Sequence, residues 1–430
     1  MSAAAPLRLG LAGLGTVGIG VVKIVQGHAE MIAARAGRPV AISAVSARDR
    51  SRNRDADLSA YAWEADPVAL AKREDVDVFV EVMGGHEGAA LAATEAAIAA
   101  GKDVVTANKA LLAHHGQALA LAAEAKGGVI RFEAAVAGGI PVIKALTEGL
   151  AGNRIRRVMG VMNGTCNYIL TRMQSAGLPY ETVFEEARQL GYLEADPNLD
   201  VGGIDAGHKL SLLSAIAFGT QVSFGAVELE GIGNVSIDDI RLAEDMGYRI
   251  KLLGVAQLTG RGLEQRMTPC LVPADSPLGQ LQGGTNMVVL DGDSVGQIVL
   301  RGPGAGQGPT ASAVMADVID IARGLRLPTF GIPAAALSTP TAASSATPAP
   351  YYLRMTLLDK PGALAKIATC LGDAGVSIDQ MRQYGHQDAN APVLIVTHKA
   401  APDDVAHAMT RFAGTGVLVG APVAIRIEEV

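Results

Sequence analysis

The sequence has few of the features that mark a secreted, a membrane-embedded or a nucleic-acid-binding protein. Only three cysteines occur in 430 residues, far apart and without a C-x-x-C pair, which argues against a disulfide framework and a structural zinc site. No segment is apolar for long enough to cross a bilayer, and the first ten residues lack the pattern of a signal peptide. Basic residues form no long run, and the net charge of −7 does not fit a nucleic-acid binder. These absences predict a cytoplasmic protein that binds neither nucleic acid nor membrane and acts on small metabolites.

Hydrophobic residues, in contrast, make up 49% of the chain, which is enough to form a large buried core. A length of 430 residues is typical of two or three domains. The pattern of strands and helices predicts a first domain at 1–139, which a late segment near 301–330 completes. We expect a second, α+β domain at 140–328, a linker at 329–350 and a small C-terminal domain at 351–430.

A glycine fingerprint follows the first predicted strand. The apolar run at 7–12 leads into Gly13, Gly15 and Gly18, and a helical pattern begins there. In a dinucleotide-binding turn the first glycine allows a tight turn, the second lets the backbone approach a pyrophosphate, and the third lets the helix pack on the strand. The motif alone also fits a tight connection that binds nothing. The strand before it and the helix after it favour a nucleotide site.

Strand and helix patterns alternate through the first 139 residues, as in "VDVFVEVMGG" and "GAALAATEAAIAAGK". This alternation predicts an α/β fold with a doubly wound parallel sheet of the Rossmann type. The second predicted strand ends at Arg48, where an NAD-preferring site usually carries an acidic residue. A guanidinium suits a 2′-phosphate, so Arg48 favours NADP, with NAD still possible. The alternative is that Arg48 and Arg50 only solvate a loop.

The C-terminal part differs in composition from the rest. Residues 338–350 are rich in serine, threonine, proline and alanine and predict a flexible, partly extended linker. The βαββαβ pattern that follows predicts a ferredoxin-like fold. Its stretch "LLDKPGALAKIA" resembles the ACT family of amino-acid-binding regulatory domains. A ferredoxin-like domain can also serve only as a dimerisation surface, so regulation is one of two interpretations.

The segment "GYLEADPNLDVGGIDAGHK", residues 191–209, carries four carboxylates and a lysine among glycines. Asp205 and Lys209 are four residues apart and would be neighbours on one helical face, where the aspartate can hold a lysine that donates a proton. Glu194 and Asp200 on the preceding loop would suit an ammonium group on a substrate. The alternative is a solvated acidic loop followed by an ordinary ion pair on a helix surface.

Several motifs together resemble the homoserine dehydrogenase family. The acidic segment looks like the signature of that family, and "GLAGLGTVG", "TANKALL", "FEAAVAGGIP", "MNGTCNYIL" and "GAGQGPTASAV" stand in the family's order. With its ACT-like domain the chain is similar to the longer, monofunctional type. The resemblance implies reversible NAD(P)H-dependent reduction of L-aspartate 4-semialdehyde to L-homoserine, in threonine, methionine and isoleucine biosynthesis. It also implies a homodimer or homotetramer that associates through the 140–328 domain.

The resemblance also assigns roles to residues. Lys209, Lys109 and Asp205 would form the catalytic set, with Lys209 as the proton donor to the carbonyl oxygen. Glu194 and Asp205 would hold the amino and hydroxyl groups of the substrate, and Asp200 would orient Lys209 or a bound water. Besides the three glycines and Arg48, the implied cofactor residues are Leu14, Thr16, Val17, Thr106, Lys109, Gly191 and Gly306. A structural monovalent cation, usually sodium, would be bound by Glu133, Val136, Gly138 and Ile140. In one departure from the family's pattern, Leu199 precedes Asp200 where some members carry a second acid.

For the C-terminal domain the resemblance implies feedback control by L-threonine. We expect the effector to bind near the turns at 359–362 and 375–377, at Asp359, Gly362 and Val376. Deleting residues 351–430 should then leave activity and remove inhibition.

Two other functions fit parts of the sequence. One is a different NAD(P)-dependent amino-acid or aldehyde dehydrogenase, against which the acidic segment argues. The other is a catalytically idle amino-acid sensor that keeps the fold. The presence of Lys109, Asp205 and Lys209 argues against the sensor.

Overall fold

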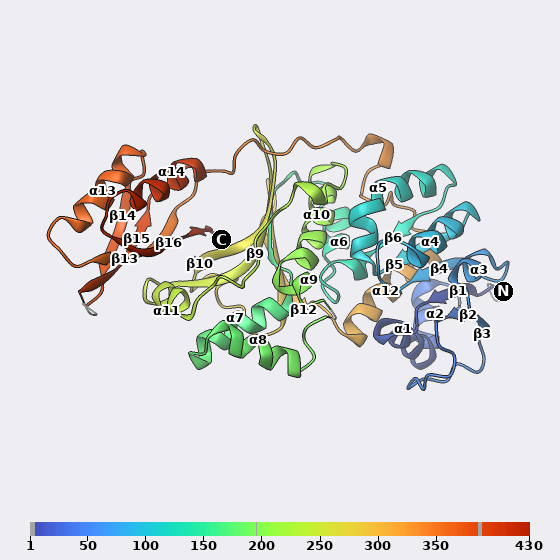
Figure 1. Ribbon diagram of the computed structural model, residues 1–430. Coiled ribbons are helices and arrows are strands. Elements are labelled where there is room, and N and C mark those ends of the chain that lie inside the picture. Colours follow the sequence, from blue (N-terminus) through green and yellow to red (C-terminus); the bar gives the residue numbers. More distant parts are fainter. Residues whose placement is uncertain (1–4, 195, 386–388) are drawn as a thin grey trace.

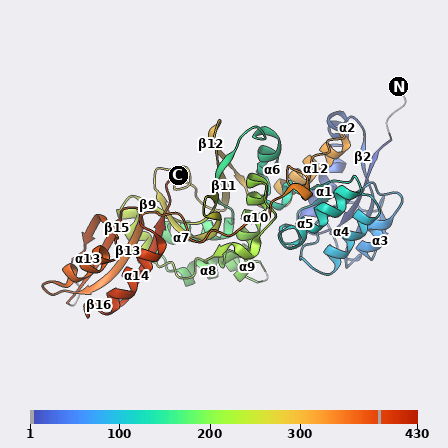
Figure 2. The ribbon, with the colours of Figure 1, turned by 90° about the horizontal axis from the view of Figure 1, so that it is seen from above.

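The computed structural model describes residues 5–194, 196–385 and 389–430. Three parts follow one another along an elongated molecule: the N-terminal sheet at one end, a central sheet, and the C-terminal domain at the other end (Figures 1 and 2). Within the described ranges, no single helix has the length and apolarity needed to cross a membrane, although the bent pair at 16–27 and 29–36 meets both requirements by length and composition alone.

The N-terminal sheet has six parallel strands in the order β3-β2-β1-β4-β5-β6. The strands are β1 (Leu7–Ala12), β2 (Val40–Ser46), β3 (Ala62–Glu64), β4 (Val78–Glu81), β5 (Asp103–Thr106) and β6 (Ile130–Arg131). Helices cover both faces of this sheet: α1 (Thr16–Gly27), α2 (Ala29–Ala36), α3 (Pro67–Lys72), α4 (Ala89–Ala99), α5 (Lys109–Ala125) and the late helix α12 (Gln307–Ala322).

The two faces of the N-terminal sheet have separate cores because successive side chains of a strand point to opposite faces. On β4, Val78 and Val80 pack with residues of α1, α2 and α12, whereas Phe79 packs with residues of α3, α4 and α5. The chain thus returns to the first sheet through α12, which lies beside α1 (Figure 1). A Cβ atom at Gly20 of α1 would come within 2.6 Å of the Gln307 carbonyl oxygen, so only glycine allows this close contact.

The central sheet is antiparallel in the order β12-β11-β7-β9-β10. Its strands are β7 (Ile155–Val161), β9 (Tyr248–Thr259), β10 (Gly262–Pro273), β11 (Thr285–Gly292) and β12 (Gly296–Pro303), with the short β8 (Glu228–Leu229) beside β10. The helices of this part are α6 (Val142–Lys144), α7 (Gly164–Ala176), α8 (Tyr180–Gln189), α9 (Asn198–Val201), α10 (Ile204–Phe218) and α11 (Ile237–Asp245).

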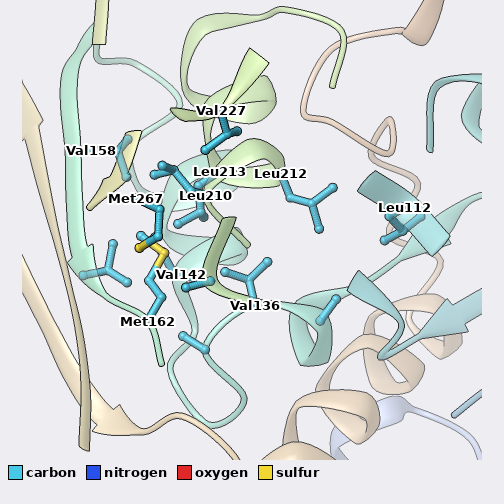
Figure 3. Packing of buried hydrophobic residues seen from close by; sticks show 14 of the residues in the cluster. Leu112, Val136, Val142, Val158, Met162, Leu210, Leu212, Leu213, Val227 and Met267 are labelled. Carbon is cyan, nitrogen blue, oxygen red and sulfur yellow. The ribbon is translucent and has the colours of Figure 1, made fainter. Parts of the chain in front are cut away.

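Helix α10 packs on the central sheet through a continuous apolar cluster. Figure 3 shows Leu210 and Leu213 of α10 against Val158 of β7 and Met267 of β10, with Met162 beside Met267. This packing fixes the start of α10, and therefore the acidic segment, on the end of the sheet.

The C-terminal domain consists of β13 (Tyr351–Leu358), α13 (Ala363–Asp373), β14 (Ile378–Gln383), β15 (Asn390–Thr397), α14 (Pro402–Ala413) and β16 (Leu418–Ile427). This βαββαβ order confirms the predicted ferredoxin-like ACT fold, and the two sheets confirm the Rossmann and α+β parts. Strand β16 also pairs in parallel with β10, where Cys270 lies opposite Arg426 and Leu271 opposite Ile427. The ACT sheet and the central sheet are therefore one continuous sheet.

The segment before the ACT domain differs from the predicted flexible linker. The backbone amide of Leu263 donates to the Thr341 carbonyl oxygen at 2.8 Å, and the amide of Ala343 donates to the Leu263 carbonyl oxygen at 2.9 Å. The amide and hydroxyl of Thr347 both donate to the Glu264 carboxylate. Composition predicts the lack of regular structure but not these long-range partners on β10, which hold the segment in place.

Candidate active site

A cavity of about 580 Å³ lies where the carboxyl ends of the Rossmann strands face the central domain. Both parts contribute to its walls: the glycine turn, the starts of α5, α7 and α10, the acidic segment and the loop between β12 and α12. The lining residues that bear on the chemistry are Thr16, Val17, Lys109, Asn163, Gly191, Glu194, Asp200, Asp205, Lys209, Asn286 and Gly306. In open α/β sheets, ligands bind at this edge of the strands.

One buried carboxylate organises two lysines in this cavity. Lys209 Nζ lies 2.7 Å from Asp205 Oδ2, and Lys109 Nζ lies 3.0 Å from Asp205 Oδ1. Lys209 Nζ also donates to the Met162 carbonyl oxygen at 2.8 Å. Because an ammonium group has three donors, one N–H of Lys209 remains for a group in the cavity. The spacing of four residues on α10 brings Asp205 and Lys209 together, and Lys109 is placed by the start of α5, where Asn108 caps the helix.

The three charges stabilise one another electrostatically. Burial alone would raise the pKa of Asp205, but Lys209 and Lys109 together lower that pKa well below its ordinary range. The charge of Asp205 raises the pKa of Lys109 against the opposing effect of burial. Asp205 is thus held as a carboxylate between Lys109 and Lys209, and Glu194 and Asp200 are the other charged groups that line the cavity.

Asp200 lies beside this group without contacting Lys209. Its Oδ1 accepts a hydrogen bond from Asn163 Nδ2 at 2.9 Å, and its Oδ2 accepts one from the Glu194 backbone amide at 3.0 Å. Asn163 Nδ2 also donates to Asp205 Oδ2 at 3.2 Å. Asp200 therefore holds Asn163 and the acidic loop in position, and Asn163 connects it to Asp205, the partner of Lys209. Asn163 gave no signal in the sequence beyond its place in "MNGTCNYIL".

Glu194 extends from the acidic loop to the edge of the cavity. Partial burial raises the pKa of its carboxyl group, and Lys109 acts in the opposite direction. Asp200 itself lies on α9, a single helical turn. The sequence did not predict this turn because glycines and Pro197 surround it.

The glycine turn has the geometry that a dinucleotide turn requires. Gly13 has a φ of 106°, and a Cβ atom there would come within 2.6 Å of the Val82 carbonyl oxygen. A Cβ atom at Gly18 would lie 1.9 Å from the Gly13 carbonyl oxygen, so the helix packs closely on the strand. Nothing lies within 4 Å of a Cβ atom built at Gly15, and Gly15 is the residue before the start of α1. The turn thus leaves open space at a helix N-terminus, which suits a pyrophosphate.

The other predicted cofactor residues lie in different settings. Thr16, Val17, Gly191 and Gly306 line the cavity, whereas Leu14 is buried beside them. The Thr106 side chain is fully buried and donates to Glu81 Oε2 at 2.6 Å, so it does not reach the cavity.

Two arginines after β2 lie in different settings. Arg48 is exposed beyond the end of the strand. Arg54, which the sequence did not indicate, donates from Nε to the Leu14 carbonyl oxygen at 3.2 Å and lies 5.6 Å from the Trp63 ring.

The four residues of the predicted cation site come from a turn and a buried carboxylate. Strand β6 before this turn is only two residues long, because a 3-10 turn at 133–135 follows it. Ala137 and Gly138 then have φ values of 54° and 44°, which turn the backbone sharply beside Val136 and Ile140. Glu133 accepts backbone hydrogen bonds from Ile143 and Lys144 at 2.9 and 2.8 Å.

The chemistry of this turn fits a cation. Burial and the charge of Asp317 raise the pKa of Glu133 to about 7, so a positive charge nearby would stabilise the ionised carboxylate. No cluster of three histidine, cysteine or acidic side chains that could hold a metal ion occurs in the described part of the chain. A cation here would therefore depend on backbone carbonyl oxygens in addition to Glu133.

A second cavity of about 600 Å³ adjoins the first at Lys109 and Asp205. Three histidines that sequence reasoning missed line it: His86 and His114 are stacked with centroids 4.3 Å apart, and His208 lies 5.5 Å from His114. Burial and the neighbouring His114 lower the pKa of His208 to about 4, so this ring is neutral at physiological pH. The three histidines come from separate segments of the chain, so only the fold brings them together.

The predicted effector residues are only partly together. Asp359 and Gly362 line a cavity of about 530 Å³ at the junction of β13 and α13. Val376 is 2% exposed and packs in the core of the ACT domain, away from the lining of that cavity.

Comparisons with known proteins agree with the geometry. Residues 13–133 match the NAD-binding domain of homoserine dehydrogenase, residues 141–319 match the homoserine dehydrogenase family itself, and residues 351–414 match the ACT domain. Homoserine dehydrogenase of Neisseria gonorrhoeae is 45% identical over 413 residues and covers 94% of each chain. That of Pseudomonas aeruginosa is 42% identical over 433 residues and covers 99% of each chain.

Solved structures give the same result. The crystal structure of a homoserine dehydrogenase from Thiobacillus denitrificans has a TM-score of 0.94 and 40% identity, with both chains covered completely. A hyperthermophilic archaeal homoserine dehydrogenase in complex with NADPH has a TM-score of 0.62 and 26% identity, covering 76% of this chain and all of that one. The chain therefore belongs to the homoserine dehydrogenase family, the NAD(P)-dependent oxidoreductases that act on homoserine, and carries a C-terminal ACT domain.

Proposed function

We propose that this chain uses NADPH to reduce L-aspartate 4-semialdehyde to L-homoserine, with Lys209 as the proton donor. The observation that carries the proposal is the pair of ammonium groups on Asp205, with one N–H of Lys209 left for the cavity. Reduction of an aldehyde places negative charge on its oxygen, and a fixed ammonium group both stabilises that charge and supplies the proton. Homoserine-dependent reduction of NADP, followed by absorbance, tests this activity directly.

The residues around the lysines support the placement of the substrate. Lys109 adds a second positive charge near the reacting oxygen, and Asp205 keeps both ammonium groups in position. Glu194 and Asp205 offer carboxylate oxygens to the substrate's amino and hydroxyl groups. Gly164 and Thr165 at the start of α7 line the same cavity, and the N-terminus of this helix suits the substrate's carboxylate. Bound NADPH would supply the hydride, and the open turn at Gly15 with the N-terminus of α1 would hold its pyrophosphate.

NADP is proposed as the preferred cofactor because Arg48 is exposed at the end of β2, where the adenine ribose of a dinucleotide lies. Replacing Arg48 with alanine should raise the KM for NADPH about tenfold, since a charge-assisted hydrogen bond to phosphate is lost. The KM for NADH should stay within about twofold, because NADH lacks the 2′-phosphate. Steady-state kinetics with both cofactors measure this, with Arg52→Ala as the control for loss of a neighbouring exposed arginine. An equal effect on both cofactors would show that Arg48 does not recognise the phosphate.

A monovalent cation, sodium in the first instance, is proposed at Glu133 and the backbone of Val136, Gly138 and Ile140. Sodium chloride should then raise the free energy of unfolding above its value in choline chloride of equal ionic strength. A concentration one hundred times the Kd would add about 2.7 kcal/mol. Glu133→Gln should remove the difference between the two salts. Equal stability of the wild-type chain in both salts would exclude a stabilising sodium site.

The pH dependence gives a second measurement of the same site. Without sodium, folded Glu133 keeps its proton up to about pH 7, whereas the unfolded residue loses it near its ordinary pKa of 4.5. The folded state thus binds more protons in this interval, and stability should fall as pH rises from about 4.5 to 7. Sodium should reduce this loss because it favours the ionised carboxylate.

L-Threonine is proposed as the effector of the ACT domain, at the cavity that Asp359 and Gly362 line. Replacing Asp359 with alanine should raise the threonine concentration for half-inhibition about tenfold or more, because the amino group of threonine loses a carboxylate partner. The activity without threonine should not change. Asp373→Ala, which removes an acid paired with Arg411 at 2.6 Å outside the cavity, is the matched control. Full threonine sensitivity in the Asp359 variant would exclude this site.

A homodimer or homotetramer is proposed as the working form. Strand β12 lies at the end of the ten-stranded sheet, and most of its side chains are at least partly exposed. Such an edge can pair with a second copy of the chain. Light scattering of the purified protein would give the number of subunits.

A further inference from the structure

Asn286, at the start of β11, has a buried oxygen atom without a donor. The residue is 1% exposed and lines the first cavity. Its Nδ2 donates to the Met162 carbonyl oxygen at 3.0 Å. A carbonyl oxygen can only accept, so this contact fixes which end of the amide is nitrogen. Oδ1 is then left buried, and no donor in the described part of the chain reaches it.

A buried acceptor without a partner destabilises a folded protein. Such groups in a binding cavity suggest a ligand, because a bound donor would satisfy them. Asn286 also shares its Met162 acceptor with Lys209, so both side chains lie on the same wall. The amide of Asn286 therefore lies in the wall of the cavity where hydride and proton transfer are proposed.

The loop after β12 packs tightly against Asn286. A Cβ atom at Gly304 would lie 2.0 Å from Asn286 Nδ2, so this position requires glycine. The loop continues through Gly306 into α12, which packs on α1 after the dinucleotide turn. Asn286 is thus next to the segment that joins the central sheet to the cofactor side of the cavity.

Two N–H donors of the reactants could reach this oxygen: the carboxamide of the nicotinamide ring and the α-ammonium group of the substrate. Glu194 and Asp205 already offer carboxylates to the ammonium group. We propose that Asn286 Oδ1 accepts a hydrogen bond from an N–H group of a bound reactant, with the nicotinamide carboxamide as the favoured source. This inference rests on the cofactor and substrate placement proposed above.

The test uses equilibrium binding, so it does not depend on turnover. The full-length chain and Asn286→Leu are titrated by calorimetry with NADP and with its 3-acetylpyridine analogue, in which a methyl group replaces the carboxamide NH₂. The wild-type chain should bind NADP about tenfold more tightly than the analogue, because the analogue lacks the donor. In Asn286→Leu this ratio should fall to nearly one. Asn286→Ala serves as the second variant, and circular dichroism checks that each variant is folded.

A second titration distinguishes the two sources of the N–H group. L-Homoserine is titrated into each protein saturated with NADP. If the cofactor ratio is unchanged but homoserine binds about tenfold more weakly to the variants, the ammonium group is the donor and the proposal holds. If folded variants bind NADP, the analogue and homoserine as the wild-type chain does, Asn286 only supports Gly304 and the proposal is wrong. Homoserine oxidation by the wild-type chain tests the proposed function separately.

Discussion

Replacing Lys209 with alanine should lower kcat for homoserine oxidation by about 10²–10⁴, the usual contribution of a positioned acid or base. In the direction of oxidation the same amine receives the hydroxyl proton as the hydride leaves. Nothing else in the described site takes over this position, because Lys109 lies on the other oxygen of Asp205. Steady-state absorbance at the nicotinamide band measures the effect.

A matched control separates this role from the loss of any buried lysine. Lys251 is 4% exposed, and its Nζ donates to Asn167 Oδ1 at 3.0 Å and to the Leu281 carbonyl oxygen, outside the reaction cavity. Burial lowers its pKa to about 8. Lys251→Met should reduce stability and leave kcat within about tenfold of the wild-type value, well short of the loss expected at Lys209. Equal losses of kcat in the two variants would indicate a general effect on folding.

Replacing Arg266 with methionine should lower the free energy of unfolding by about 3–5 kcal/mol, the usual result of breaking a buried ion pair from one side. Arg266 is 2% exposed on β10 and pairs with Glu264 on its own strand and with Glu428 after β16. Glu428 also pairs with Arg426. The network lies at the parallel contact between β10 and β16, so it joins the ACT sheet to the central sheet.

An exposed ion pair between the same two parts provides the control for this second prediction. Arg382 of β14 and Asp245 of α11 also join the two parts, but both side chains are nearly half exposed. Arg382→Met should therefore change the unfolding free energy by less than about 1 kcal/mol. Urea denaturation of both variants measures the difference. Similar values for the two variants would mean that the β10 and β16 contact does not hold the domains together.

This contact changes how regulation should be tested. The sequence predicted that deleting residues 351–430 would leave activity intact. In the structure such a deletion also removes β16, one of the strands that pair with β10, and separates Arg266 from Glu428. Point substitutions at the effector cavity, such as Asp359→Ala, are therefore a cleaner test than truncation.

The parts of the fold that depend on local periodicity could be predicted from the sequence. The Rossmann sheet and the ACT domain follow from alternating apolar patterns and from glycines at turns such as Gly13. The pairing of β10 with β16 could not, because it joins residues more than 150 positions apart and β16 looks like any other edge strand. For the same reason the linker was predicted to be flexible, whereas Thr341 and Thr347 are bound to β10.

Some contacts of the candidate site could likewise be predicted from the sequence, and others could not. Asp205 and Lys209 are four residues apart on one helix, so their contact was predictable. The contacts of Lys109 with Asp205 and of Asn163 with Asp200 depend on the packing of separate segments, which spacing does not reveal. Thr106 was placed among the cofactor residues by resemblance, yet its hydroxyl group faces the buried Glu81. A motif indicates where a residue stands in the chain but not where its side chain points.

The most direct test of the role of Lys209 is a single-turnover measurement with Lys209→Ala at saturating NADP and homoserine, after the Kd of each has been measured. If Lys209 is the proton donor, both Kd values should stay within about threefold of the wild-type values, and the rate of nicotinamide reduction should fall by a factor of about 10³. A rate within tenfold of the wild-type value, with both ligands bound, would mean that another group transfers the proton.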